Sequence, residues 1–165
     1  LTKGCSGAEE VQHSEIDLVR LLSKSIGLCE DEFGQGGLTG RRNYGAEAIP
    51  LITYGARMHQ VFANLLGNAI KSALPGTRIF LEVKEGESGY RVRMMNTAAY
   101  EMDFVPEEIV QRFARGDKAR STRGSGLGLA IAQTYTESEG GSFRGAVCGA
   151  QFSAIVELPK PERNL

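Results

Sequence analysis

The sequence lacks the features of a disulfide-bonded, membrane-spanning or strongly charged protein. Its three cysteines, Cys5, Cys29 and Cys148, are widely spaced, and neither their number nor their spacing fits a disulfide framework or a metal site. We therefore expect free thiols in a reducing compartment. The net charge of -1 excludes a global attraction to nucleic acid or anionic lipid. No apolar run is long enough to cross a bilayer.

The sequence also lacks an internal repeat and a signal-like segment at its start. It has 165 residues, 41% of them hydrophobic, which suits one compact domain with a substantial core. We expect a single domain over 1–165, with loose ends at 1–13 and 160–165. Because Leu1 opens no signal-like segment, we expect the chain to be part of a longer protein.

Hydrophobic periodicity predicts an α+β fold. Helical spacing favours helices at 14–33, with Ser14 as N-cap, at 57–74, at 106–113 and at 127–139. Alternating segments at 77–85 and 90–95, and again at 142–147 and 151–159, predict two hairpins, and 48–53 predicts a short strand. Together they predict a two-layer sandwich, in which a mixed, mostly antiparallel sheet carries helices on one face.

The helix predicted at 57–74 separates an apolar half from a polar stripe. The apolar half comprises Met58, Val61, Phe62, Leu65, Leu66, Ala69, Ile70 and Ala73, and the stripe comprises Gln60, Asn64, Asn68 and Lys71. Asparagine forms helices less readily than Glu, Lys or Arg, so a plain solvated face has little reason to use it twice. Amide oxygens beside an ammonium suit a hydrated magnesium ion and a polyphosphate. The stripe alone fits either a solvated helix face or a site for magnesium and polyphosphate.

A glycine-rich run, GSGLGLA at 124–130, precedes the last predicted helix. Gly124, Gly126 and Gly128 would let the backbone approach a ligand closely, and the helix start offers unpaired amides and a positive dipole end. The run follows no strand, as a dinucleotide fingerprint would, and it lacks the GK[ST] of a P-loop. It favours a phosphate cradle of another kind.

The segment just before the glycines is strongly basic. Against a single Asp117 it carries Arg112, Arg115, Lys118, Arg120 and Arg123. A solvated loop or a nucleic-acid patch would also be basic, but the segment lacks the aromatic residues that stack on bases. Cations beside glycines fit a triphosphate better.

These motifs, in this order and spacing, resemble the ATP-binding catalytic domain of bacterial sensor histidine kinases, which shares its fold with gyrase, Hsp90 and MutL ATPases. HQVFANLLGNAIKSA resembles the family's asparagine box, PEEIVQRFARGDKAR its phenylalanine box and basic lid, and GSGLGLAIAQTYTESEGGSF its second glycine box. The resemblance extends over 15–159.

The resemblance implies an ATP-dependent protein-histidine kinase with ATP and magnesium as cofactors. It implies that Asn68 ligates magnesium and that Asn64 and Lys71 approach the phosphates. It also places the lid residues Arg115, Lys118 and Arg120, with the backbone of Gly124, Gly126, Leu127 and Gly128, around the phosphates. Asn64, Lys71, Arg115 and Arg120 would serve phosphoryl transfer, in which the protein mainly positions groups and neutralises charge.

The family's first glycine box, Asp-x-Gly-x-Gly, is altered. By the family's spacing Asn96 stands in place of the Asp, Ala98 in place of the first glycine and Tyr100 in place of the second, while Ala150 replaces a frequent Ser or Thr near the base. Asn96 and Ala98 would still lie at the adenine. Losing one charge-assisted hydrogen bond costs about 1.5 to 3 kcal/mol, so we expect weak ATP binding.

Neither histidine resembles the family's phosphoacceptor. His13 lacks the surrounding pattern of a dimerisation helix and is expected to be exposed at a helix start, and His59 is expected to pack partly buried. The resemblance therefore implies that the substrate histidine lies on a separate dimerisation domain, with a response regulator downstream. It implies a cytoplasmic domain without nucleic-acid or direct membrane contact, whether or not the parent protein is membrane-anchored.

Two other functions stay open. The altered adenine box fits a regulatory pseudokinase that binds no nucleotide, and the fold also serves anti-sigma-factor serine kinases. Retention of Lys71, Arg115 and the glycines favours catalysis over the first. Hydrolysis of the gyrase type is disfavoured because its general-base glutamate would stand where this chain has Asn64.

Overall fold

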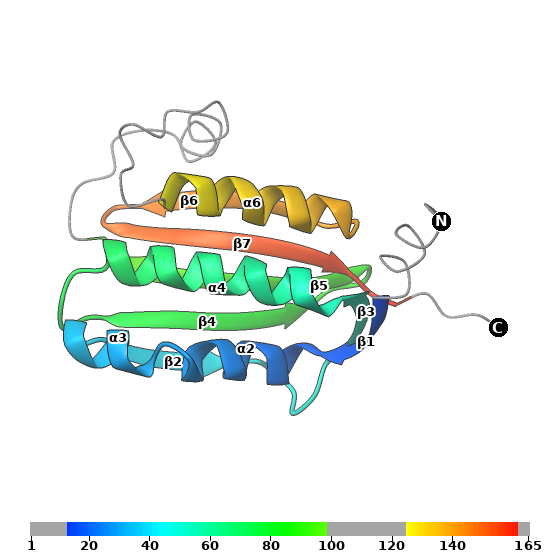
Figure 1. Ribbon diagram of the computed structural model, residues 1–165, viewed down its shortest axis with the longest axis horizontal. Coiled ribbons are helices and arrows are strands. Elements are labelled where there is room, and N and C mark those ends of the chain that lie inside the picture. Colours follow the sequence, from blue (N-terminus) through cyan, green and yellow to red (C-terminus); the bar gives the residue numbers. More distant parts are fainter. Residues whose placement is uncertain (1–12, 99–124, 162–165) are drawn as a thin grey trace, which may run out of the picture.

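The computed structural model describes residues 13–98 and 125–161 (Figure 1). The elements are β1 (His13–Asp17), α2 (Leu18–Gly27), α3 (Glu30–Gly36), β2 (Thr39–Asn43), β3 (Pro50–Tyr54), α4 (Gly55–Ser72), β4 (Arg78–Glu85), β5 (Gly89–Thr97), α6 (Ser125–Ser138), β6 (Ser142–Cys148) and β7 (Gln151–Pro159). The helix predicted at 106–113 lies outside the described residues.

The main sheet has five strands in the order β2-β4-β5-β7-β6. β2 runs parallel to β4, and the other neighbours are antiparallel. α2, α4 and α6 lie side by side across one face of this sheet, while β1 and β3 form a small antiparallel sheet at one end (Figure 1). The predicted α+β sandwich and both predicted hairpins are confirmed.

The core lies between α4 and the sheet. The predicted apolar face of α4 is buried, apart from Ile70, which is only partly covered. Alternate residues of the central hairpin meet it, because the register places Val83 of β4 opposite Val92 of β5, both at most 4% exposed. Burying each large apolar side chain contributes about 1.5 to 3 kcal/mol. This packing fixes which side of α4 is left for polar residues.

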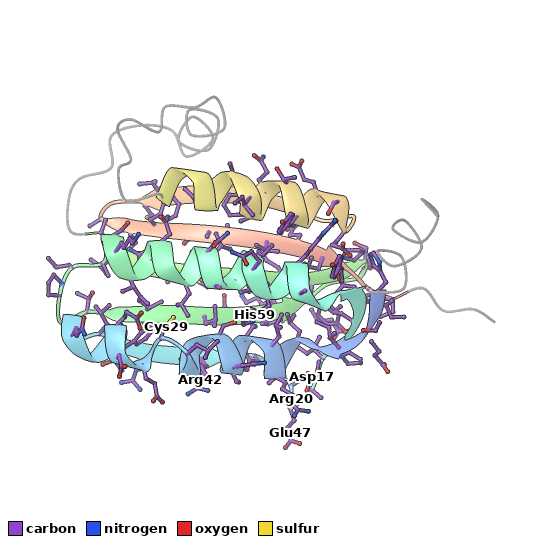
Figure 2. All side chains as sticks on the ribbon, viewed as in Figure 1. Asp17, Arg20, Cys29, Arg42, Glu47 and His59 are labelled. Carbon is purple, nitrogen blue, oxygen red and sulfur yellow. The ribbon has the colours of Figure 1, made fainter. Side chains whose placement is uncertain are left out.

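The prediction of one helix over 14–33 was wrong. His13–Asp17 is a strand whose Ile16 pairs with Leu51, so pairing with β3 overrides the helical spacing of this segment. The helix cap is Asp17, labelled in Figure 2, rather than Ser14. Its Oδ1 accepts from the amide of Val19 at 3.1 Å and from that of Ile49 at 2.9 Å. The helix then ends at Gly27 and a separate α3 follows.

Both described cysteines, Cys29 and Cys148, are free thiols, as predicted. Burial raises the pKa of the Cys29 thiol, and the carboxylate of Glu32 raises it further. None of the helices in the described ranges is both long and apolar enough to cross a membrane.

The expected loose ends fall mostly on 1–12 and 162–165, outside the described residues. The described parts are held: His13 belongs to β1, and the Lys160 amide donates to the Ser88 carbonyl at 3.0 Å. Lys160 also forms an ion pair with Glu85 at 2.8 Å.

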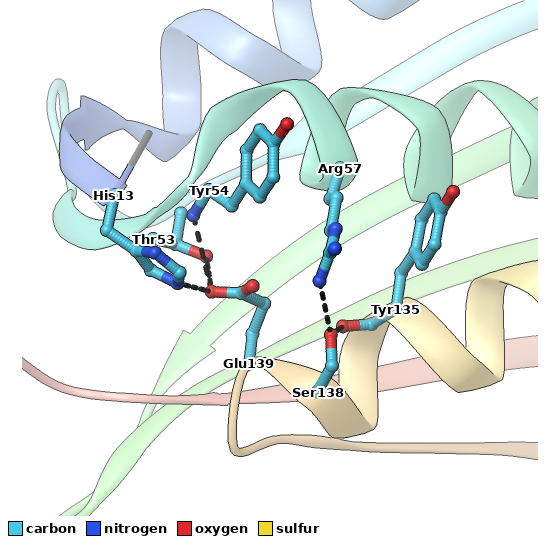
Figure 3. A network of polar contacts seen from close by, with 7 residues as sticks. All are labelled: His13, Thr53, Tyr54, Arg57, Tyr135, Ser138 and Glu139. Atoms are coloured by element: carbon cyan, nitrogen blue, oxygen red, sulfur yellow. Dashed lines mark hydrogen bonds and ion pairs between the residues drawn. The ribbon is translucent and has the colours of Figure 1, made fainter. Parts of the chain in front are cut away.

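A buried carboxylate joins the end of α6 to the small sheet (Figure 3). The Glu139 side chain is 4% exposed. Its Oε1 lies 3.0 Å from His13 Nε2, and it accepts hydrogen bonds from Thr53 Oγ1 at 2.8 Å and from the Tyr54 amide at 3.2 Å. We call these four residues the Glu139 clasp. His13, expected at a helix start, lies in β1 instead, paired with Tyr54.

Beside the clasp, Arg57 links the start of α4 to the end of α6 (Figure 3). Its guanidinium lies 4.8 Å from the ring centre of Tyr54 and 5.3 Å from that of Tyr135, and it donates to Ser138 Oγ at 3.3 Å. Cation–π contacts of this kind stabilise by about 0.5 to 1 kcal/mol at exposed sites.

We expect Glu139→Ala to lower the free energy of unfolding by about 1 to 3 kcal/mol, because it leaves the buried Thr53 hydroxyl and the Tyr54 amide without their acceptor. Urea unfolding measures the change. Glu137→Ala, at an exposed position two residues earlier, is the matched control and should change stability by less than about 0.5 kcal/mol. Equal effects of the two substitutions would show that the clasp contributes nothing specific.

Candidate functional site

The ends of three elements meet at one end of the sandwich (Figure 1). There α4 ends, β5 ends and α6 begins. α4 and α6 run antiparallel, since Asn64 lies beside Gly128 while Arg57, two turns earlier, lies beside Ser138. The second half of α4 therefore faces the glycine-rich start of α6.

The polar stripe of α4 contacts α6. Asn64 and Asn68 are half-buried, whereas Gln60 and Lys71 are exposed. The Asn64 amide is held on both sides: its Oδ1 accepts from Gln60 Nε2 at 3.1 Å, and its Nδ2 donates to the Gly128 carbonyl at 3.5 Å. The stripe is therefore partly covered by α6 rather than wholly exposed to solvent. Asn68 and Lys71 follow on the same face, one and two turns nearer the end of α4.

α6 begins at Ser125, two residues before its predicted start. Gly126, Leu127 and Gly128 therefore lie in the first helical turn, where the dipole end is positive and the amides before that of Gly128 have no partner within the helix. A Cβ on Gly128 would meet Asn64 Cβ and Cγ at 3.6 Å, which is an ordinary contact. Packing against α4 thus does not require glycine at this position.

Asn96 is buried near the end of β5. It is 2% exposed and lies on the helix-covered side of the sheet, in the same row as Val92 and Met94. Its partners across the strands are Ile79 on β4 and Phe152 on β7. Its Nδ2 has no hydrogen-bond partner among the described residues. A buried amide without a partner costs about 1 to 3 kcal/mol unless a ligand or water bonds it.

Ala98 fastens the end of β5 to its surroundings. It forms an isolated bridge with Ala73, just after α4, and its amide donates to the Ala150 carbonyl at 2.7 Å. One residue earlier, the Thr97 carbonyl accepts from the Leu74 amide at 2.8 Å. The backbone around Asn96 is therefore tied to α4 and to the β6–β7 turn.

The structure brings part of the predicted site together. Asn64 and Gly128 are in contact, Asn68 and Lys71 continue the same stripe, and Asn96 and Ala98 lie where β5 ends beside α4. Four predicted residues lie outside the described residues: Arg115, Lys118, Arg120 and Gly124. The contact of Asn64 with the Gly128 carbonyl was not foreseen, since no sequence signal marks a pair 64 positions apart.

The described residues hold no group of three or more His, Cys, Asp or Glu side chains able to bind a metal ion. A magnesium ion at this end would depend on amide oxygens, with water or phosphate completing its coordination. The Asn68 carboxamide fits that chemistry. His59, on α4, is half-buried, as expected (Figure 2).

A cavity of about 630 Å³ lies at the other end of the sheet, around the β4–β5 turn and the start of β6. The Arg91–Glu157 ion pair at 2.9 Å lies on its wall, with both side chains about half exposed. This wide surface hollow contains none of the predicted site residues.

Residues 53–161 match the family described as histidine kinase-, DNA gyrase B-, and HSP90-like ATPases, HATPase_c. The chain belongs to this family. The match begins at the end of β3 and includes α4, the central hairpin, α6 and the last hairpin. This HATPase_c domain therefore has the ATP-binding fold that the asparagine and glycine motifs predicted.

Similar proteins include a histidine-protein kinase and a sensor protein. The domain is 29% identical over 168 residues to the signal transduction histidine-protein kinase BaeS of Escherichia coli, an alignment covering all of this chain and 36% of BaeS. It is 36% identical over 112 residues to the sensor protein SrrB of Staphylococcus aureus, covering 64% of this chain and 19% of SrrB. The chain thus spans about a third of BaeS and a fifth of SrrB.

Among solved structures, the catalytic domain of histidine kinase ThkA, in a nucleotide-free form, superposes with a TM-score of 0.79 at 23% identity, covering 90% of this chain and 95% of that one. ThkA in complex with the response regulator TrrA gives a TM-score of 0.74 at 21% identity, covering 90% and 42%. At these identities the likeness supports the fold.

We expect Gly128→Ala to leave the free energy of unfolding unchanged or to raise it by up to about 1 kcal/mol, since alanine favours a helix and the added methyl group meets only ordinary contacts. Gly140→Ala is the matched comparison: its φ of 84° is costly for alanine, so it should lose about 1 to 2 kcal/mol. Urea unfolding of both variants checks this. A loss at Gly128 as large as that at Gly140 would mean that packing does require this glycine.

Proposed function

We propose that this domain binds Mg-ATP and transfers the γ-phosphate to a histidine on a separate dimerisation domain of a two-component sensor kinase. One observation carries the proposal: the asparagine stripe of α4 lies against the glycine-rich first turn of α6, through the contact of Asn64 with Gly128. Amide side chains and unpaired backbone amides then face the same small region. Backbone amides can donate hydrogen bonds to phosphate oxygens, and amide side chains can supply an oxygen ligand to magnesium.

In this proposal each group has a role. Asn68 ligates magnesium, while Asn64 and Lys71 approach the phosphates from α4. The amides of Gly126, Leu127 and Gly128 receive phosphate oxygens at the positive end of α6. The basic segment contributes Arg115, Lys118 and Arg120, with the backbone of Gly124. Catalysis consists of positioning ATP and neutralising charge on the transferred group, and it needs no covalent intermediate on this domain.

The acceptor lies on another domain in this proposal. His13 is engaged by the Glu139 clasp, and His59 is half-buried in α4. Neither is presented to a nucleotide at the other end of α6. Response-regulator binding by ThkA supports a response regulator as the downstream partner. We place the domain in the cytoplasm, where ATP and response regulators are found.

A nucleotide-free pseudokinase is the second candidate, because Asn96, Ala98 and Ala150 replace the residues expected at the base. Asn96 also bears on this choice: it is still polar and 98% buried, with an unpartnered Nδ2. A site that had lost its ligand would gain stability from an apolar residue there. This favours nucleotide binding. A serine kinase of the same fold differs in its acceptor. It is distinguished from a histidine kinase by whether the phosphate on the product is stable or labile in acid.

We expect Mg-ATP to bind at micromolar to millimolar strength in a calorimetric titration, and Asn68→Ala to abolish the magnesium dependence by removing the metal ligand. Asn43→Ala, at an exposed position in β2, is the matched control and should leave the affinity unchanged. Absence of both heat and thermal shift at several millimolar Mg-ATP would remove the kinase assignment. Retained magnesium dependence in Asn68→Ala would remove the metal assignment alone.

We expect the domain incubated alone with γ-labelled ATP to acquire no phosphohistidine, since neither of its histidines faces the site. Supplying the dimerisation domain of the parent protein should produce a phosphate on that partner that is labile in acid and stable in base. An acid-stable phosphate on a serine of an added protein would instead identify the serine-kinase alternative.

A further inference from the structure

We propose that Asn96 gives the base site a relaxed specificity, so that it takes 6-oxopurine nucleotides, such as inosine triphosphate, as well as adenine nucleotides. The inference rests on the proposed function and specifies its substrate class. It identifies Asn96 as the residue that determines which purine edge is accepted.

Asn96 is placed to read a base edge. The side chain lies between the helix layer and the sheet, 2% exposed, with the apolar residues Ile79 and Phe152 opposite it on the neighbouring strands. A flat apolar ring would find apolar contacts there, with a single polar group at the edge. The end of β5 is also the end of the sandwich at which α6 begins, so a base near Asn96 would have its phosphates on the side of the glycine turn (Figure 1).

Hydrogen bonds hold the backbone around Asn96, whereas its Nδ2 has no described partner. Bonds from Leu74 to Thr97 and from Ala98 to Ala150 hold the strand end. No described residue bonds the Nδ2, so no bond of that nitrogen fixes which edge of the carboxamide a ligand meets. Rotating the amide by half a turn exchanges its donor for its acceptor.

The two orientations of the carboxamide suit two kinds of purine. At position 6 adenine presents an amino donor, which the Oδ1 accepts, whereas hypoxanthine presents a carbonyl oxygen, to which the Nδ2 donates. A carboxylate can only accept. It would bond the amino group more strongly, because the bond is charge-assisted, and it would oppose the carbonyl oxygen. Asparagine at this position therefore lowers the affinity for ATP but lets the site accept both kinds of purine.

The test compares ATP with inosine triphosphate, which carries the same ribose and phosphates, by calorimetric titration with magnesium. We expect the unsubstituted protein to bind the two within about tenfold of each other, since either edge gains one neutral hydrogen bond. We expect Asn96→Asp to tighten ATP by up to about tenfold and to weaken inosine triphosphate by at least about tenfold, which raises the preference for ATP about a hundredfold.

Two further variants keep the test decisive. Asn68→Ala acts on the phosphate side, so it should change both affinities by the same factor. If Asn96→Asp does not fold, as a thermal melt would show, Asn96→Ala replaces it: both nucleotides should weaken equally, because both lose their bond to the amide.

The outcomes separate the two proposals. If neither nucleotide binds, the proposed function fails and this inference fails with it. If ATP binds and is preferred over inosine triphosphate by more than about tenfold, or if Asn96→Asp leaves the preference unchanged, the inference alone is overturned. The same holds if Asn96→Ala weakens only one of the two nucleotides.

Discussion

The packing of α4 on the sheet determines where the polar residues of this helix lie. Six of its apolar side chains, from Met58 to Ala69, are buried in the core. Burying one side of a helix also fixes the direction in which its other side faces. On α4 that other side carries the polar stripe of Gln60, Asn64, Asn68 and Lys71. α6 lies beside this stripe and brings its first turn against Asn64. The hydrophobic effect thus positions polar groups that contribute little to the core themselves.

The parts of the fold that follow from local pattern were predictable from the sequence. The two sides of α4, both hairpins and the last helix could be read because each repeats with the period of its element. β1 and β2 could not, since each is short and is a strand because of its partner: Ile16 pairs with Leu51, and Arg41 pairs with Phe80. The site divides in the same way. Its residue types and spacing were visible, while the Asn64–Gly128 contact depends on tertiary packing. The basic segment stays a prediction.

In the proposed function, where Asn96 lies at the base, one atom changes the balance of the site. Asn96 has nearly the shape of the aspartate it replaces but exchanges an oxygen for a donor nitrogen. Buried and uncharged, it avoids the desolvation cost of a carboxylate. It forgoes a charge-assisted bond in return. In that proposal Asn64, Asn68 and Lys71 serve the phosphates, so most of the affinity for a nucleotide would come from the triphosphate, which is common to all nucleoside triphosphates, rather than from the base.

The Glu139 clasp and the glycine turn lie at opposite ends of the same helix. α6 has 14 residues, which makes it about 21 Å long. Helices are stiff along their axis, so a shift of its first turn by an ångström would either stretch the three bonds to His13, Thr53 and Tyr54 or carry the small sheet along. A displacement of β1 is thereby transmitted along α6 to the glycine-rich first turn at the far end of that helix.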